Sequence, residues 1–136
     1  MFWDPESTKK LLQSGLKLVM FPLDVTNKLP VDRNFLKEFA VQSNFPVSNL
    51  FSQMFAVSYF EDPQHFHDYF LWDVTAAGYF GAKDLFKYKK LEIDLITEGQ
   101  DQGKTILKPG SGQWVNVALD IERDNFISFL KNLLRK

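Results

Sequence analysis

The fold class is decided by a short apolar run, LKLVMF at residues 16–21. A nearly continuous apolar run of this length is typical of a strand covered on both faces, as in a parallel sheet. A helix is predicted before it, because Asp4-Pro5-Glu6 combines an N-cap residue, a first-position proline and a first-turn acid. Gly15 suits the left-handed conformation in which many helices end. Helix, glycine and buried strand in this order predict an α/β fold.

Polar residues follow this predicted strand directly. Asp24, Thr26 and Asn27 lie just past its carboxyl end, where open α/β sheets bind their ligands. The same residue types are common in ordinary loops, where Asp and Asn side chains stabilise turns. Position alone leaves both interpretations open.

Two amphipathic helices are predicted next, one opening at Pro30-Val31-Asp32 and one running from about Val47 until Glu61-Asp62-Pro63 ends it. An apolar stripe of this kind is more typical of core packing than of a ligand pocket. The apolar positions are Val31, Phe35, Leu36 and Phe39 on the first helix, and Leu50, Phe51, Met54, Phe55 and Tyr59 on the second.

After Phe86 the spacing of the apolar residues changes from that of a helix to that of a strand. Residues 88–96 alternate between apolar and charged side chains, as in a half-exposed strand. Two more strands, over 104–107 and 113–119, and a final helix complete the chain. The residues expected to face the core here are Leu91, Ile93, Leu95, Val115, Val117, Leu119, Phe126, Ile127, Leu130, Leu133 and Leu134. The sequence therefore predicts one α/β domain with a buried parallel-type strand, flanking helices and an antiparallel C-terminal strand region.

Composition restricts the class of protein. A chain of 136 residues with 45% hydrophobic and 24% charged residues is long enough for one packed domain. The net charge of −1 argues against a nucleic-acid partner, and we interpret the basic run at 87–90 as a solvated strand edge rather than an anion site. No apolar stretch approaches the roughly 18 residues of a membrane span, and no signal peptide is visible. The chain has no cysteine, and we expect a cytoplasmic protein.

Chemically versatile residues concentrate between His65 and Tyr79, where a helix is predicted to begin at Asp73. His65 and His67 are the only histidines, and without cysteine they do not predict a zinc site. Asp73 and Asp24 are hard oxygen ligands that suit Ca²⁺ or Mg²⁺. Two carboxylates are too few for a tight calcium site, which takes roughly 6–8 oxygens.

Several segments together resemble the C-terminal half of the inosine–uridine-preferring nucleoside hydrolases. They are DPE at residues 4–6, PLDVTNK at 22–28, YFLWDVTAA at 69–77, EG at 98–99 with GKT at 103–105, and VNVALD at 115–120. Their order and spacing agree with the family, and the resemblance covers essentially the whole chain.

The resemblance implies hydrolysis of the N-glycosidic bond of a ribonucleoside to ribose and free base, with Ca²⁺ as cofactor. In the family, an N-terminal aspartate cluster supplies the general base and most calcium ligands, and Asp73 matches the last ligand. Trp72 resembles the purine-specific branch, in which an indole stacks on the base; the alternative is a core or interface aromatic. His67 and Tyr69 match a segment that closes over the base and are candidate ligand contacts.

The family's N-terminal aspartate cluster is absent here, so none of its general-base residues is present. We therefore expect residues 1–136 to form a partial, truncated hydrolase domain that is inactive in isolation. Its expected partners are the missing N-terminal half or a homologous subunit, with a purine nucleoside in the complete enzyme. The alternatives are a non-catalytic module that docks on such a partner, and an unrelated soluble α/β domain. We also expect poor solubility of the chain alone, since LKLVMF is a strand that needs neighbours on both sides.

Overall fold

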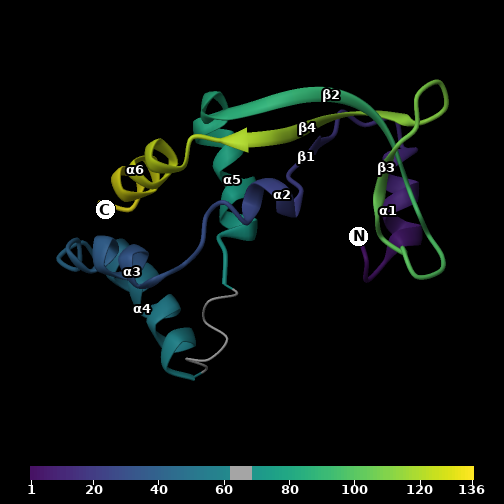
Figure 1. The fold of residues 1–136 in the computed structure, drawn as a ribbon. Coiled ribbons are helices and arrows are strands. Elements are labelled where there is room, and N and C mark those ends of the chain that lie inside the picture. The colour runs from purple at the N-terminus through teal and green to yellow at the C-terminus, as the bar shows by residue number, and fades with distance from the viewer. Residues whose placement is uncertain (62–68) are drawn as a thin grey trace. The chain divides into compact units, whose positions relative to one another are not determined.

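The computed structural model describes residues 1–61 and 69–136 (Figure 1). They form two compact units, one of Met1–Met20 with Tyr88–Leu119, the other of Phe21–Lys87 with Asp120–Lys136. The four strands form a mixed sheet in the order β1-β4-β2-β3. The predicted α/β class is confirmed. Among the described residues, no helix combines the length and apolar character needed to cross a bilayer.

The first unit contains helix α1, Pro5–Leu12, and most of the sheet. Asp4 caps α1 as predicted, because its carboxylate accepts a hydrogen bond of 3.0 Å from the Ser7 backbone N–H. After α1, Gly15 has a φ of 75°, the left-handed conformation that its position predicted.

Three longer segments complete the sheet: β2 is Phe86–Leu95, β3 is Thr105–Leu107 and β4 is Gln113–Ile121. β2 and β3 pair antiparallel, which confirms the C-terminal antiparallel region. The core of this unit includes five buried side chains from α1, β2 and β4, which pack with the partly buried Leu18, Met20 and Leu91. The five are Leu12, Ile93, Leu95, Val115 and Val117.

The first strand differs in length and burial from the strand predicted at residues 16–21. Only Val19–Met20 forms β1, which pairs parallel with β4, as Val19 opposite Asn116 shows. Both residues of β1 are half-buried, and Leu16 is 64% exposed. The reason is the position of β1 at the edge of the described sheet, with one neighbouring strand instead of two. Parallel pairing was correctly predicted, and burial on both faces was not.

The second unit is mostly helical. Its elements are α2 (Leu23–Thr26), α3 (Arg33–Ala40), α4 (Pro46–Glu61), α5 (Trp72–Ala82), the 3₁₀ turn η2 (Lys83–Leu85) and α6 (Arg123–Leu133). α3 packs on α4 through a cluster of four phenylalanine rings, whose centroids lie 4.7–6.0 Å apart. The rings belong to Phe35 and Phe39 on α3 and to Phe51 and Phe55 on α4.

Several residues predicted to face the core are exposed. On α4, Leu50 is 60% and Met54 is 61% exposed, while the neighbouring Phe51 and Phe55 face α3. With about 100° between successive helical residues, positions 50 and 54 turn away from the face that α3 covers. Leu119 of β4 and Leu133 of α6 are also about half exposed.

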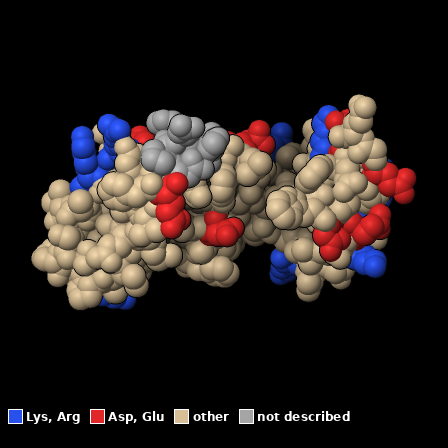
Figure 2. Space-filling model, turned by 90° about the horizontal axis from the view of Figure 1, so that it is seen from below, with Lys and Arg blue, Asp and Glu red and all other residues tan. Residues whose placement is uncertain are grey.

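Figure 2 shows one face of the molecule, on which most of the surface is neither acidic nor basic.

Two glycines allow α5 and α6 to approach closely. A Cβ atom at Gly78 would overlap the ring of Phe126, which is fully buried. At Gly81 a Cβ atom would lie 2.8 Å from the tip of the Phe129 ring, which is only partly buried. The short residues of α5 therefore set the distance between the two helices.

Gly78→Ala is expected to lower the free energy of unfolding by about 1–3 kcal/mol, because the ring of the fully buried Phe126 would have to shift within the packed interior. Urea unfolding followed by circular dichroism measures the change. Gly81→Ala is the matched control: Phe129 can shift, and the gain in helix propensity of about 1 kcal/mol offsets the contact. Equal losses in both variants would contradict this account of the packing.

Candidate functional site

The N-terminal turn of α5 is held in place by a short backbone pairing in front of it. The Val31 N–H donates to the Tyr69 carbonyl and the Leu71 N–H donates to the Leu29 carbonyl, both at 2.9 Å. Pro30 and Phe70 form the antiparallel bridge between these two bonds. Leu29, Val31 and Leu71 are almost completely buried, so apolar burial and hydrogen bonding fix the same point of the chain.

Helix α5 starts from this anchor. The buried Thr75 donates its backbone N–H, at 2.8 Å, and its hydroxyl to the Leu71 carbonyl. Trp72 and Asp73 therefore occupy the first helical turn, one residue earlier than the predicted start at Asp73.

The indole of Trp72 is fixed by a side chain from a distant part of the sequence. Its Nε1–H donates to Oδ1 of Asn27, which follows α2, over 2.9 Å. The Phe70 ring lies beside it, with centroids 5.8 Å apart and an interplanar angle of 42°. Trp72 is still 41% exposed, so the hydrogen bond orients the indole without burying it. The arrangement offers a flat aromatic surface, whose N–H is already satisfied, to a planar ligand.

The structure brings Trp72 together with Asn27, one of the polar residues that follow the first strand. The sequence alone left open whether these residues bind a ligand or stabilise a turn. Asn27 contacts the indole, whereas the Asp24 side chain is exposed and Thr26 is buried in α2. No pattern in the sequence could show this pairing, because 45 positions separate Asn27 from Trp72.

The carboxylate of Asp73 is exposed in the first turn of α5, next to Trp72. Within residues 1–61 and 69–136, no group of three or more His, Cys, Asp or Glu side chains could hold a metal ion. Calcium needs roughly 6–8 oxygen ligands. The described residues therefore do not fit a calcium ion by themselves, although Asp73 is accessible as a single ligand.

The remaining candidate residues precede the helix. Tyr69 is partly exposed, and its backbone carbonyl is engaged by Val31. His67 and His65 lie outside the described residues.

A charged cluster that sequence analysis did not identify lies next to Asn27 in the chain. The Asp120 carboxylate pairs with the Lys28 ammonium at 2.7 Å and with the Lys87 ammonium at 3.2 Å. Hydrogen bonds from Lys28, from the Ile121 backbone N–H and from Lys87 lower the pKa of Asp120 to about 2. This cluster connects the segment that carries Asn27 to the end of β4.

Comparison with known proteins shows which protein family the chain resembles. The family model described as inosine-uridine preferring nucleoside hydrolase matches residues 1–128. The pyrimidine-specific ribonucleoside hydrolase RihA of Salmonella newport is 27% identical over 99% of this chain and 46% of its own length. Nucleoside hydrolase 3 of Arabidopsis thaliana is 24% identical, over 77% of this chain and 14% of its own length.

Solved structures agree. The inosine-uridine preferring nucleoside hydrolase from Bacillus anthracis has a TM-score of 0.85 and 26% identity, covering 98% of this chain and 42% of that one. The purine-preferring ribonucleoside hydrolase from Gardnerella vaginalis shares the fold, with a TM-score of 0.74, 20% identity and coverage of 97% and 45%. The chain therefore spans slightly less than half the length of the RihA relative and of these two structures.

Asn27→Ala is expected to free the indole N–H of Trp72, because no other described residue is seen to accept it. In a ¹H–¹⁵N spectrum the Trp72 side-chain signal should shift and exchange faster with water. The signal of Trp114, whose ring lies under the Lys90 ammonium in the first unit, serves as the control. An unchanged Trp72 signal would rule out the hydrogen bond in solution.

Asp120→Asn is expected to flatten the dependence of stability on pH in the acid range. The folded pKa of about 2 lies below the ordinary value of 3.8, so this carboxylate stabilises the fold above pH about 4 and loses that effect as the pH falls towards 2. Urea midpoints measured between pH 5 and pH 2.5 test this. Salt at about 1 M should reduce the difference between the proteins, because the cluster is partly exposed. The same acid dependence in both proteins would contradict the assignment.

Proposed function

Since the chain belongs to the inosine–uridine-preferring nucleoside hydrolase family, we propose that it supplies the base-binding side of a site that hydrolyses ribonucleosides. The reaction breaks the N-glycosidic bond with water and yields ribose and a free base. Hydrolysis of N-glycosyl bonds is the activity of the relatives named nucleoside hydrolases. For this chain the activity is a proposal, because the chain covers less than half of the RihA relative.

The observation that carries the proposal is the hydrogen bond between Trp72 and Asn27. It holds a half-exposed indole at the start of α5, next to the carboxylate of Asp73. A base that stacks on such a ring gains roughly 1–3 kcal/mol in other systems. Because Asn27 already occupies the indole N–H, Trp72 would recognise the base through its ring face rather than through a hydrogen bond.

We propose a purine as the preferred base. Support comes from Trp72 itself: a bicyclic base overlaps an indole over a larger area than a monocyclic base does. An indole has no proton to give at neutral pH, so Trp72 would help the base to leave by stacking and not as an acid. The RihA relatives are named for pyrimidine specificity, so identity to them does not support this preference.

Asp73 is proposed as one metal ligand of the complete site. It is exposed at a helix start beside the proposed base position. The described residues do not form a calcium site alone, so the remaining ligands would come from other parts of the enzyme. For this reason we propose that the chain does not hydrolyse nucleosides on its own. Tyr69 and His67 are proposed as further contacts to the base from the segment that precedes α5.

A non-catalytic docking module is the second candidate. The observation that favours it is an exposed apolar stripe on α4, at positions separated by three, four and three residues. The stripe consists of Val47, Leu50, Met54 and Val57. A module of this kind would bind its partner without any release of ribose.

The proposed function predicts how substitutions at Trp72 change turnover. The chain alone should release no ribose from inosine. After refolding together with the part of Salmonella newport RihA outside the matched 46%, it should do so. In that complex Trp72→Ala should lower kcat/KM for inosine by about 5- to 150-fold, the equivalent of 1–3 kcal/mol. Trp72→His should raise the ratio of uridine to inosine turnover.

Trp114→Ala provides the matched control, since Trp114 is an exposed tryptophan of the first unit. It should leave kcat/KM unchanged. Ribose release by the chain alone would refute its inactivity. An unchanged kcat/KM in Trp72→Ala would refute base stacking, and a complex without activity would favour the docking module.

A further inference from the structure

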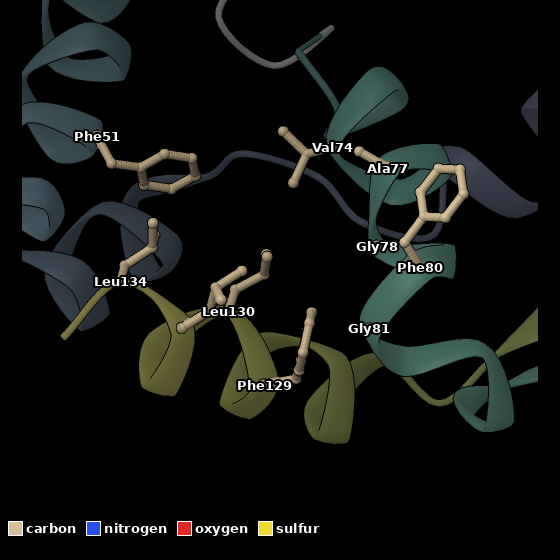
Figure 3. A pocket seen from close by; sticks show the side chains of 10 residues that line it. Phe51, Val74, Ala77, Gly78, Phe80, Gly81, Phe129, Leu130 and Leu134 are labelled. Carbon is tan, nitrogen blue, oxygen red and sulfur yellow. The ribbon is translucent and has the colours of Figure 1, made fainter. Parts of the chain in front are cut away.

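An apolar groove of about 490 Å³ lies within the second unit, between α4, α5 and α6. Figure 3 shows Phe51 of α4 and Val74 of α5 reaching towards the same space, with Leu130 and Phe129 of α6 below them. All ten residues that line the groove are apolar or glycine. Phe80, on the edge of the groove, is 91% exposed.

The groove does not suit a nucleoside or another polar small molecule. Sites for such ligands combine apolar walls with a few polar groups that fix the orientation of the ligand. No lining residue offers a polar side chain here. An apolar peptide segment, whose own polar groups are satisfied in its secondary structure, is the kind of ligand that this surface can bind.

Helix α5, which forms one wall of the groove, also has an unusual composition for a helix that is partly exposed. Along α5 the sequence WDVTAAGYFGA places apolar or small side chains on all sides after Asp73. A helix of this composition is normally buried all round. α6 covers one face of it, through Gly78 and Phe126, and leaves Ala77 and Phe80 exposed. The exposed side of α5 therefore requires a cover that the described residues do not provide.

The relatives contain a large part that this chain does not match. The chain matches RihA over 46% of the relative's length and the Bacillus anthracis structure over 42% of that chain, so more than half of each lies outside the match. We propose that the groove is the docking surface for an apolar segment from that other part of the nucleoside hydrolase fold. The inference rests on the proposed function, because a completed site needs both parts. What it adds to that function is the place at which the two parts of the fold join.

The absence of cysteine makes this surface directly testable, since one introduced thiol is unique in the chain. Ala77→Cys places a thiol in the groove, and Ala40→Cys places one at the exposed end of α3 in the same unit. Each variant is refolded with and without the part of Salmonella newport RihA outside the match. The reaction rate with a maleimide is then measured. We expect the rate at position 77 to fall at least tenfold with that polypeptide present and the rate at position 40 to stay unchanged.

Substitutions of the groove give the second measurement. Phe80→Glu should abolish the protection at position 77, whereas Val41→Glu, at an equally exposed apolar residue outside the groove, should not. Both residues are exposed enough for the chain to fold with either change, which circular dichroism checks. Full reactivity at position 77 with the polypeptide present overturns the proposal, whether or not the two associate elsewhere. Protection that depends on the concentration of this chain alone also overturns it, because a second copy would then fill the groove.

Ribose release from inosine, measured in the same samples, separates this proposal from the proposed function. Protection of the groove without hydrolysis supports the docking surface and counts against the activity. Hydrolysis without protection supports the activity and shows that the parts join elsewhere.

Discussion

The backbone pairing of residues 29–31 with residues 69–71 is the constraint on which the candidate site depends. Two hydrogen bonds of 2.9 Å join segments that lie about forty positions apart, and the buried Leu29, Val31 and Leu71 surround them with apolar contacts. Helix α5 begins at Trp72, directly after the residue that this pairing fixes. The indole then lies within reach of Asn27, and the two interactions together hold α2 against the start of α5.

Much of the fold could be predicted from local patterns. The cap at Asp4, the left-handed Gly15, the antiparallel β2–β3 pair and the amphipathic α3 follow from short-range rules, and the structure confirms them. Periodicity was less informative about burial. It identified the apolar residues of α4 correctly, but it could not show that Phe51 faces α3 while Leu50 faces outward. Which apolar face is covered depends on the neighbours of a helix, and a single helix sequence does not contain them.

The candidate site illustrates the same limit more sharply. Trp72 and Asp73 could be selected from the sequence, because their residue types and their position at a helix start are visible there. Their partners could not. Asn27 lies 45 positions from Trp72, and Lys28 lies 92 positions from Asp120. In the sequence each is one polar residue among many, and only the fold shows that both come from one segment after α2. The family resemblance selected this segment as a unit without indicating what its side chains contact.

The arrangement separates two tasks that a nucleoside hydrolase must perform. Base recognition needs an oriented aromatic surface, and under the proposed function the indole of Trp72, held by Asn27, would provide that surface. Metal binding needs several oxygen ligands that converge on one point, and Asp73 alone does not meet that requirement. The apolar groove also calls for another part of the fold. Helix α5, which forms one wall of the groove, is apolar on most sides, and such a helix is stable when it is covered. If docking and completion of the metal site involve the same polypeptide, the free energy gained by covering the groove also brings the remaining ligands to Asp73. Substitutions in the groove would then weaken metal binding without any change to a metal ligand, whereas substitutions at Trp72 would change base preference and leave metal binding intact.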